Sequence, residues 1–245
     1  MNEIDFTDKM VLVTGGSSGI GNGIARVFRE HGATVHVTGT RESAEDYSDT
    51  DGSLLDGLTY HQLDVSDDAA VEAFDPGFER LDVLTNSVGT VQYKRREFEM
   101  AGFREVVDVN LIGVFHCCTR FHEMLARTKG TAINVGSVAS YRATRGNPAY
   151  SASKGGLRTL TMSLAELWAR DGVRVNGIAP GFVESKLTKI SRDNPEIYEA
   201  SLKSIPMRRW GDPEEMGSVV LFLASPLASY ITGQMIIVDG GQSLS

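Results

Sequence analysis

The chain has 245 residues, 41% of them hydrophobic, and a formal net charge of −8. This length suits one large α/β domain or two small ones. Because no Pro-rich, Ser/Gly-rich or repeated segment divides the chain, we expect a single domain over residues 1–245. A surface of this charge repels nucleic acid and anionic membranes, so neither is expected as a partner.

The sequence shows no sign of export or of metal binding. Residues 1–5 are acidic and lack the apolar core of a signal peptide. No apolar run reaches the roughly 18 residues of a membrane span. The only cysteines, Cys117 and Cys118, are adjacent, which suits neither a disulfide nor a metal site. We therefore expect packing cysteines, no metal and a cytoplasmic location.

A glycine-rich stretch near the N-terminus predicts a nucleotide site. The apolar run Met10–Thr14 indicates a buried strand, and Gly15-Gly16-Ser17-Ser18-Gly19-Ile20-Gly21 follows it directly. Helical spacing then continues to Glu30, before a second strand over Thr34–Thr38. Strand, glycine turn, helix and strand within about 30 residues form the context of a dinucleotide-binding fingerprint. The glycines let the main chain approach a pyrophosphate, and the helix N-terminus supplies N–H groups.

Tyr150 and Lys154 are the candidate catalytic pair. They are four residues apart, so on a helix they share one face. A free tyrosine has a pKa of about 10, which a nearby cation lowers toward neutrality. A phenol tuned in this way suits general acid–base catalysis near neutral pH. The alternative is that both are ordinary residues of a helix.

The glycine spacing T-G-x-x-x-G-x-G, together with Tyr150 and Lys154, resembles the short-chain dehydrogenase/reductase family. The resemblance covers nearly the whole chain. It implies an α/β fold with a single Rossmann-type, doubly wound domain: a seven-stranded parallel sheet with helices on both faces. It also implies hydride transfer between a nicotinamide cofactor and a ketone or secondary alcohol.

The resemblance supplies two further catalytic candidates. Ser137 follows an expected strand and precedes Tyr150 by the 13 residues that the family requires. Its hydroxyl is expected to hold the substrate oxygen, with Ser140 a less well placed alternative. Asn110 is expected at a helix kink, where its carbonyl holds a relay water, although it could be a mere polar interruption. The expected catalytic set is Asn110, Ser137, Tyr150 and Lys154.

The family pattern also marks the cofactor contacts. Asn86-Ser87-Val88-Gly89 stands where the family typically has Asn-Asn-Ala-Gly, and Ser185 stands in place of a threonine that binds the carboxamide. The expected cofactor-binding residues are Gly15, Ser17, Ser18, Gly19, Ile20, Gly21, Thr40, Arg41, Asp64, Val65, Asn86, Gly89, Tyr150, Lys154, Pro180, Gly181, Val183 and Ser185.

The end of the second strand favours NADP(H), with NAD(H) as the alternative. NAD-binding members usually have an acidic residue at the position of Gly39, whereas Thr40 and Arg41 suit a 2′-phosphate. Arg41 could instead only begin the next helix. The acidic segment 42–57 weakens the preference, and we expect it to form a short, frayed and mobile helix.

The remaining elements follow from periodicity and turn residues. We expect a mobile helical lid over about 186–211, with a solvated linker as the alternative. Further strands are expected over 58–63, 81–85, 131–135, 173–179 and 235–238, and further helices over 68–78, 97–109, 114–125, 150–168 and 212–223.

The chain is thus predicted to be an NAD(P)-dependent oxidoreductase of a ketone or secondary alcohol. A 3-oxoacyl reductase is one option, in which Arg127, Lys129 and Arg170 could meet an acidic acyl carrier; a small hydrophobic ketone is another. The rival is a catalytically silent dinucleotide-binding sensor. From the family we expect a homotetramer or homodimer acting on a small molecule.

Overall fold

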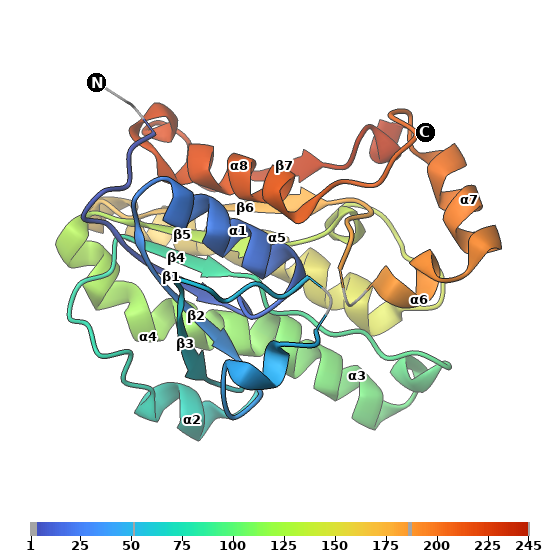
Figure 1. Ribbon diagram of the computed structural model, residues 1–245, viewed down its shortest axis with the longest axis horizontal. Helices are drawn as coiled ribbons and strands as arrows, with labels where there is room; N and C mark the ends of the chain where they lie inside the picture. The colour runs from blue at the N-terminus through green and yellow to red at the C-terminus, as the bar shows by residue number, and fades with distance from the viewer. Residues whose placement is uncertain (1–3, 51, 186–187, 245) are drawn as a thin grey trace.

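The computed structural model describes residues 4–50, 52–185 and 188–244. Its core is a seven-stranded parallel sheet in the order β3-β2-β1-β4-β5-β6-β7 (Figure 1). Successive strands are added on one side of β1 up to β3 and on its other side from β4 onward. Open α/β sheets bind ligands at such a reversal of strand order. The strands are β1 Met10–Thr14, β2 Thr34–Gly39, β3 Thr59–Gln62, β4 Val83–Asn86, β5 Thr131–Val135, β6 Arg174–Pro180 and β7 Met235–Val238.

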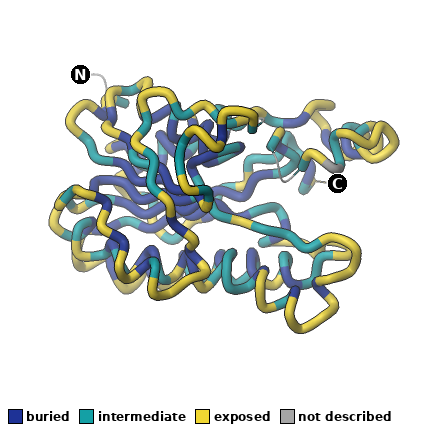
Figure 2. The backbone as a smooth tube through the Cα atoms, turned by 60° about the horizontal axis from the view of Figure 1, so that its bottom comes forward, coloured by how far each residue is buried: buried dark blue, intermediate teal, exposed yellow. Residues whose placement is uncertain are grey.

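Helices cover both faces of the sheet, as expected (Figure 1). Alternate residues of β1 serve opposite faces: Val11 and Val13 pack under α1 and α8, while Leu12 packs toward α4 and α5. The central strands are the most deeply buried part of the chain (Figure 2). The helices are α1 Gly19–Glu30, α2 Asp68–Ala73, α3 Met100–Val107, α4 Gly113–Thr128, α5 Pro148–Trp168, α6 Lys189–Arg192, α7 Pro195–Ser204 and α8 Pro213–Ala224.

The helical stretch expected over 97–109 is divided in the structure. A 3₁₀ turn covers Arg96–Phe98, α3 follows, and a π-helical turn over Asp108–Ile112 joins α3 to α4. Helix α2 ends at Ala73, earlier than the expected 78, because Phe74 is already extended. In segment 42–57 the only helical piece among the described residues is the 3₁₀ turn Glu45–Tyr47.

A chain of buried polar side chains ties the middle of the sheet together. Thr14 donates to Asn86 at 3.0 Å, and Asn86 donates to Asn134 at 3.0 Å. Asn134 in turn donates to Thr161 of α5 at 3.0 Å. Because a buried amide without partners is costly, these contacts fix the lateral position of β1, β4, β5 and α5.

Cys117 and Cys118 of α4 are fully buried in the core on the α4 face of the sheet, as expected of packing residues. Burial raises the pKa of the Cys117 thiol to about 12. Across the described ranges, no helix is both long and apolar enough to cross a membrane.

Candidate active site

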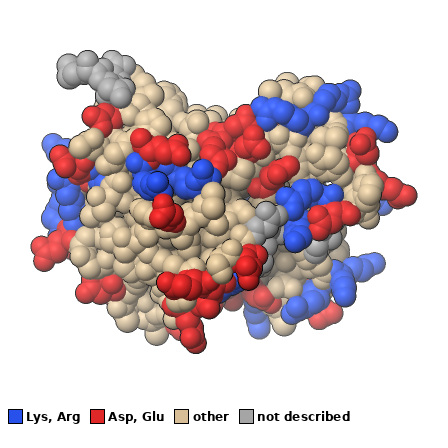
Figure 3. Space-filling view, in the orientation of Figure 1, with Lys and Arg blue, Asp and Glu red and all other residues tan. Residues whose placement is uncertain are grey.

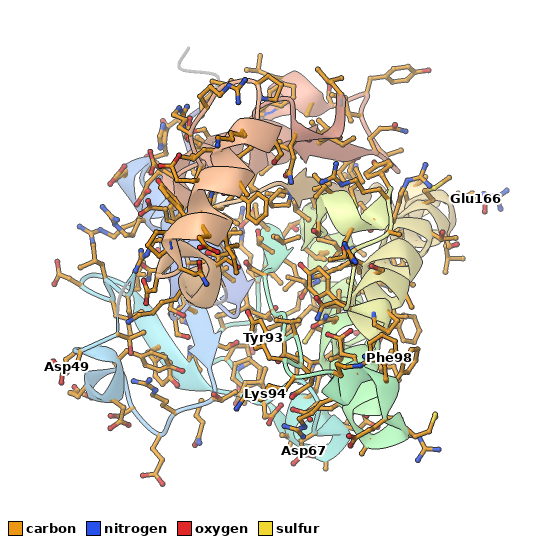
Figure 4. All side chains as sticks on the ribbon, turned by 90° about the vertical axis from the view of Figure 1, so that its right-hand side faces the viewer. Asp49, Asp67, Tyr93, Lys94, Phe98 and Glu166 are labelled. Atoms are coloured by element: carbon orange, nitrogen blue, oxygen red, sulfur yellow. The ribbon has the colours of Figure 1, made fainter. Side chains whose placement is uncertain are left out.

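A cavity of about 610 Å³ opens at the carboxyl ends of the strands. Figure 4 looks onto this edge, with Asp49 of segment 42–57 on one side, Phe98 on the other, and Tyr93 and Lys94 between them. Of the expected site residues, those that line it are Gly15, Ser17, Ser18, Gly19, Ile20, Gly21, Thr40, Arg41, Asp64, Val65, Gly89, Tyr150, Lys154 and Ser185.

The glycine-rich turn forms the floor of one half of the cavity. Gly15 and Gly19 both adopt positive φ, at 70° and 56°. A Cβ on Gly21 would overlap with the carbonyl of Gly15, so the turn can close only with glycine here. Ser18 is the N-cap residue of α1, and among the described residues its side chain makes no cap bond. The N–H groups of the first turn and the dipole of α1 therefore suit a phosphate.

Gly39, at the end of β2, has no room for a side chain. A Cβ there would overlap with the hydroxyl oxygens of Tyr47 and Ser17. Tyr47 is 6% exposed, lines the cavity, and accepts a hydrogen bond from the Arg41 main-chain N–H at 3.3 Å. Burial raises the pKa of Tyr47, but hydrogen bonds from Ser17, Arg41 and other neighbours outweigh it, and the net pKa is lowered.

Arg41 lies at this end of the cavity and does not begin a helix. Its guanidinium stacks on the ring of Tyr47, with Cζ 4.5 Å from the ring centroid, and it also donates to the Asp46 carbonyl. The stacking holds the guanidinium beside the residues that follow β2. A cation in this place suits a 2′-phosphate.

Segment 42–57 has the expected short helical piece, the 3₁₀ turn Glu45–Tyr47. Its described part, which excludes residue 51, is not frayed, because hydrogen bonds hold it against the glycine-rich turn and α1. Residues after Tyr47 cross the glycine-rich turn and hydrogen-bond to it. The Gly19 N–H donates to the Gly52 carbonyl at 2.8 Å, and the Ser53 hydroxyl donates to the Ser17 carbonyl at 2.6 Å. Leu54 exchanges two hydrogen bonds with Asn22, of 3.0 and 3.1 Å. The composition of the segment did not predict this packing, because it depends on one buried aromatic ring, that of Tyr47.

The residues after β3 and β4 divide between cavity lining and support. Asp64 and Val65 line the cavity, and the Asp64 carboxylate accepts from the N–H and hydroxyl of Ser66 at 2.9 and 2.7 Å. Asp67 is the N-cap of α2, so Asp64 is free of that role. Asn86 is fully buried in the sheet and lies behind the cavity wall; Gly89 lies at the wall.

Tyr150 and Ser137 come together at the end of β5. Tyr150 lies in the first turn of α5, and its phenol is hydrogen-bonded by the Ser137 hydroxyl. Ser137 begins the 3₁₀ turn Val138–Ser140, and its side chain accepts from the Ala139 N–H at 3.1 Å. Ser140 completes this cap by accepting from the Ser137 N–H at 3.3 Å, so Ser140 supports Ser137.

Lys154 lies below the phenol, 3% exposed. Its Nζ donates to the Val135 carbonyl at 2.9 Å and lies 5.9 Å from the centroid of the Tyr150 ring. Burial lowers the pKa of Lys154 to about 8, because the low-dielectric interior disfavours the ammonium.

The expectation that a neighbouring cation lowers the pKa of Tyr150 is wrong for this structure. Burial of the phenol raises its pKa, and Glu97 and Tyr93 raise it further. The Ser137 hydrogen bond acts in the opposite direction and is outweighed. The structure therefore holds Tyr150 as a neutral phenol at neutral pH, which is the form that donates a proton.

Asn110 lies in the π-helical turn and is fully buried. Its side-chain amide donates to the Thr90 carbonyl at 3.0 Å and to the Ser153 hydroxyl at 3.1 Å. Its carbonyl oxygen accepts from the Thr90 N–H at 2.7 Å. The side chain therefore joins the loop after β4 to helix α5, and π-turns of this kind often mark functional sites.

Of the site residues expected at the end of β6 and after it, only Ser185 lines the cavity. Pro180, Gly181 and Val183 are not among the residues that line the cavity, and Val183 pairs with Gly211 in an isolated bridge. Ser185 does line the cavity, and its hydroxyl is 3.1 Å from that of Thr188. Sequence reasoning missed several lining residues, which are Thr38, Gly39, Tyr47, Leu63, Ser66, Ser87, Val88, Thr90, Tyr93, Glu105, Val109, Val135 and Gly136.

Segment 186–211 is largely helical in its described part, as α6 and α7 show; residues 186–187 lie outside that part. Trp210 anchors it by stacking on Phe182 at 5.2 Å and donating to the Ser201 hydroxyl at 2.7 Å. Lys and Arg side chains gather over this end of the molecule, with acidic side chains among them (Figure 3). In the described ranges, no group of three or more His, Cys, Asp or Glu could hold a metal ion.

Comparison with known proteins gives consistent matches over the chain. A family model described as enoyl-(acyl carrier protein) reductase matches residues 15–243. The 3-oxoacyl-[acyl-carrier-protein] reductase FabG of Chlamydia muridarum is 35% identical, covering 99% of this chain and 100% of that protein.

Two solved structures are similar in fold. RhlG of Pseudomonas aeruginosa, in an NADP active-site complex, has a TM-score of 0.88 and 32% identity and covers 99% of each chain. A gluconate 5-dehydrogenase of Burkholderia cenocepacia, in complex with NADP and tartrate, has a TM-score of 0.89 and 29% identity. It covers 100% of this chain and 98% of its own.

Burial of Lys154 predicts a pH-dependent stability. Its folded pKa of about 8 lies below the ordinary value of 10.5, so between these values the unfolded chain binds more protons. The free energy of unfolding should then rise with pH in this window, by up to about 1.4 kcal/mol per pH unit. Lys154→Met removes the group. In urea unfolding without added dinucleotide, the variant should have a higher free energy of unfolding than wild type at about pH 8, and this difference should shrink by pH 10. A difference that is constant across this range would contradict the burial of a charged ammonium.

Proposed function

Because the chain belongs to the short-chain dehydrogenase/reductase family and is an NAD(P)-dependent oxidoreductase of ketones and secondary alcohols, we propose that it acts as an NADP(H)-dependent reductase with Tyr150 as its proton donor. The observation that carries this proposal is that Tyr150 and Lys154 line the same cavity as the glycine-rich turn, with the Ser137 hydroxyl hydrogen-bonded to the Tyr150 phenol.

The chain's own residues would bind the cofactor along the carboxyl edge of the sheet. The first turn of α1 offers main-chain N–H groups for the pyrophosphate, and Thr40 and Arg41 offer donors for a 2′-phosphate. Asp64, Val65 and Gly89 line the space between them. Pro180, Gly181, Val183 and Ser185 would flank the nicotinamide, with Asn86 supporting the sheet beneath. When bound, the dinucleotide supplies the hydride.

Tyr150 would donate its proton to the substrate oxygen as the carbonyl is reduced, and would take it back when an alcohol is oxidised. Ser137 would hydrogen-bond the same oxygen and stabilise the charge that develops on it. Lys154 would stabilise the phenolate left after proton transfer and bond the cofactor ribose. The main-chain carbonyl of Asn110 would hold the water that returns a proton through Lys154.

Tyr150→Phe tests the assignment of the proton donor. The variant keeps the ring and its packing but has no proton to give, so kcat should fall by about 100-fold or more. Turnover is followed by the absorbance of reduced nicotinamide, with 3-oxoacyl thioesters, sugar-acid ketones and small cyclic ketones as substrates.

Binding of NADPH, measured by fluorescence titration, should stay within about threefold of wild type because Tyr150→Phe leaves the cavity wall in place. Full turnover in the variant would exclude Tyr150 as the donor. A wild-type protein that binds dinucleotide and turns over none of these substrates would favour the sensor.

We propose NADP(H) over NAD(H) on the geometry at the end of β2. Gly39 has no carboxylate for a ribose hydroxyl, and the volume beside it is filled by the Tyr47 and Ser17 hydroxyls. The Arg41 guanidinium, held on Tyr47, is the cation that would meet a 2′-phosphate. The NADP bound in both solved relatives supports the same choice.

Arg41→Ala tests this preference. Loss of a charge-assisted hydrogen bond should raise the Kd for NADPH by about tenfold or more, while the Kd for NADH changes little. Tyr47→Phe is the matched control, because it keeps the ring on which the guanidinium stacks. Both constants come from fluorescence titration. Equal weakening of the two cofactors by Arg41→Ala would contradict a role in recognising the phosphate.

The substrate class follows from the relatives only in outline. They act, by their names, on a 3-oxoacyl group carried by a protein and on gluconate. Arg127, Lys129 and Arg170 precede β5 and β6, at the edge of the sheet opposite the cavity. They are therefore badly placed to bring an acyl carrier to Tyr150.

We further propose a cytoplasmic homotetramer built first as a dimer through α4 and α5. Ile112, Phe115, Met162 and Leu167 are between 44% and 66% exposed, and they lie on outward turns of these helices or of the π-turn before α4. Exposed apolar groups of this kind are typical of subunit contacts.

Sedimentation analysis should show a mass of four chains for the wild type. Phe115→Asp with Leu167→Asp should reduce it to a smaller species, because the charges would be buried in the contact. Retention of the full assembly by the double variant would place the interface elsewhere.

A further inference from the structure

Glu97 is a deeply buried carboxylate that no step above uses. It is 1% exposed and lies in the 3₁₀ turn Arg96–Phe98. The cations next to it in sequence point elsewhere: Arg95 stacks over Phe98 at 5.1 Å, and Arg96 pairs with Glu105 at 3.7 Å. Over the ranges that the structure describes, Glu97 has no ion-pair partner. Burying such a charge is costly unless hydrogen bonds compensate it.

Three N–H donors compensate the charge. The Glu97 Oε1 atom accepts from the Gln92 main chain at 3.1 Å and from the Asn147 side chain at 3.0 Å. Its Oε2 atom accepts from the main-chain N–H of Tyr150 at 3.0 Å. Hydrogen bonds to an ionised acceptor are about twice as strong as neutral ones, and three of them hold this carboxylate in one orientation.

The third bond places Glu97 at the N-terminus of the catalytic helix. Helix α5 has Asn147 at its N-cap, Pro148 next and Tyr150 at the third helical position. The N-cap side chain usually accepts from that third N–H. In α5 the Asn147 side chain makes no cap bond and instead donates to Glu97. Glu97 therefore supplies the cap from a distant segment, where the helix dipole also favours a negative charge.

Glu97 also holds a loop that lines the cavity. Through Gln92 it fixes the loop after β4, which continues directly into the cavity-lining Tyr93. The same loop contains Thr90, which Asn110 holds with two hydrogen bonds. Two neighbouring residues, Lys94 and Arg95, adopt positive φ of 54° and 64°. This uncommon backbone turns the chain so that Glu97 faces inward.

We propose that Glu97 is a positioning residue of the active site, which fixes the main chain of Tyr150 and places a negative charge at the end of the helix that carries the phenol. This inference rests on the proposed role of Tyr150. The groups that face the phenol are Ser137, Lys154, Tyr93 and, through the helix end, Glu97. Burial is the main reason that the pKa of Tyr150 is raised, and the Glu97 charge raises it further.

The loss of the Glu97 charge should shift the pH dependence of alcohol oxidation in one direction. Alcohol oxidation needs the phenolate as base, so its rate rises with pH as Tyr150 loses its proton. Removing the Glu97 charge makes that loss easier. Glu97→Gln should therefore move the acidic limb of the kcat/KM profile for oxidation to lower pH, by about half a unit or more. It should also lower kcat by about tenfold, because one N–H donor now faces an amide NH₂.

Two matched variants separate charge from structure. Glu99→Gln removes an exposed carboxylate two residues away and should leave the limb where it is in wild type. Asn147→Ala keeps the Glu97 charge but removes one donor, so it should lower the melting temperature without moving the limb. A folded Glu97→Gln protein whose limb coincides with wild type would overturn the proposal.

Glu97→Asp covers the case in which the glutamine variant does not fold. It keeps the charge but withdraws the carboxylate from the Tyr150 N–H by one methylene, so kcat should fall while the limb stays nearly in place. An unchanged kcat in this variant would overturn the positioning role.

A direct readout distinguishes failure of this inference from failure of the proposed function. The phenolate absorbance of each protein, minus that of its Tyr150→Phe counterpart, reports ionisation of Tyr150 without any substrate. Glu97→Gln should lower the midpoint of that difference titration. A lowered midpoint in a protein that turns over no alcohol would support Glu97 and count against the activity; an unmoved midpoint would overturn the Glu97 proposal alone.

Discussion

The burial of the Lys154 ammonium is the constraint on which the site depends. A charge in the protein interior is tolerated only when its position and partners are fixed, and here a single strand-end carbonyl, that of Val135, holds it. The ammonium must lie where β5 ends, beneath the phenol one helical turn earlier on α5. The parallel order of β4, β5 and β6 sets that place. The sheet topology therefore sets the position of the Lys154 Nζ atom, on which the proposed acid–base chemistry depends.

Buried side-chain amides fix the position of α5 relative to the sheet. Asn86 and Asn134 link β1, β4 and β5 and reach α5 through Thr161, while Asn110 links the loop after β4 to Ser153. None of these side chains faces bulk solvent, and each satisfies polar groups that would otherwise be unpaired. Their effect is to hold α5 at a fixed distance from the strand ends.

The strands were predictable from their short apolar runs, and the seven-stranded parallel sheet was expected from the family resemblance, but the strand order was not predicted. The kink between α3 and α4 was expected at Asn110, but only from the family resemblance. The π-turn over Asp108–Ile112 leads into Gly113, where any Cβ would overlap with the Val65 carbonyl. That close approach joins segments distant in sequence, so local periodicity could not reveal it. Glu97 was missed for a similar reason, since it is a charged residue within a charged stretch and only tertiary contacts bury it.

Segment 42–57 shows how one aromatic residue can reverse an inference from composition. Its acids and turn residues favour an exposed, frayed chain, yet the Tyr47 ring docks over the end of β2 and receives the Arg41 guanidinium on its face. The hydroxyl then takes up the volume into which a side chain at position 39 would extend. The position of the Tyr47 hydroxyl thus depends on the absence of a side chain at Gly39. An acidic residue at 39 would expel the ring, and the cation placed on it would lose its support.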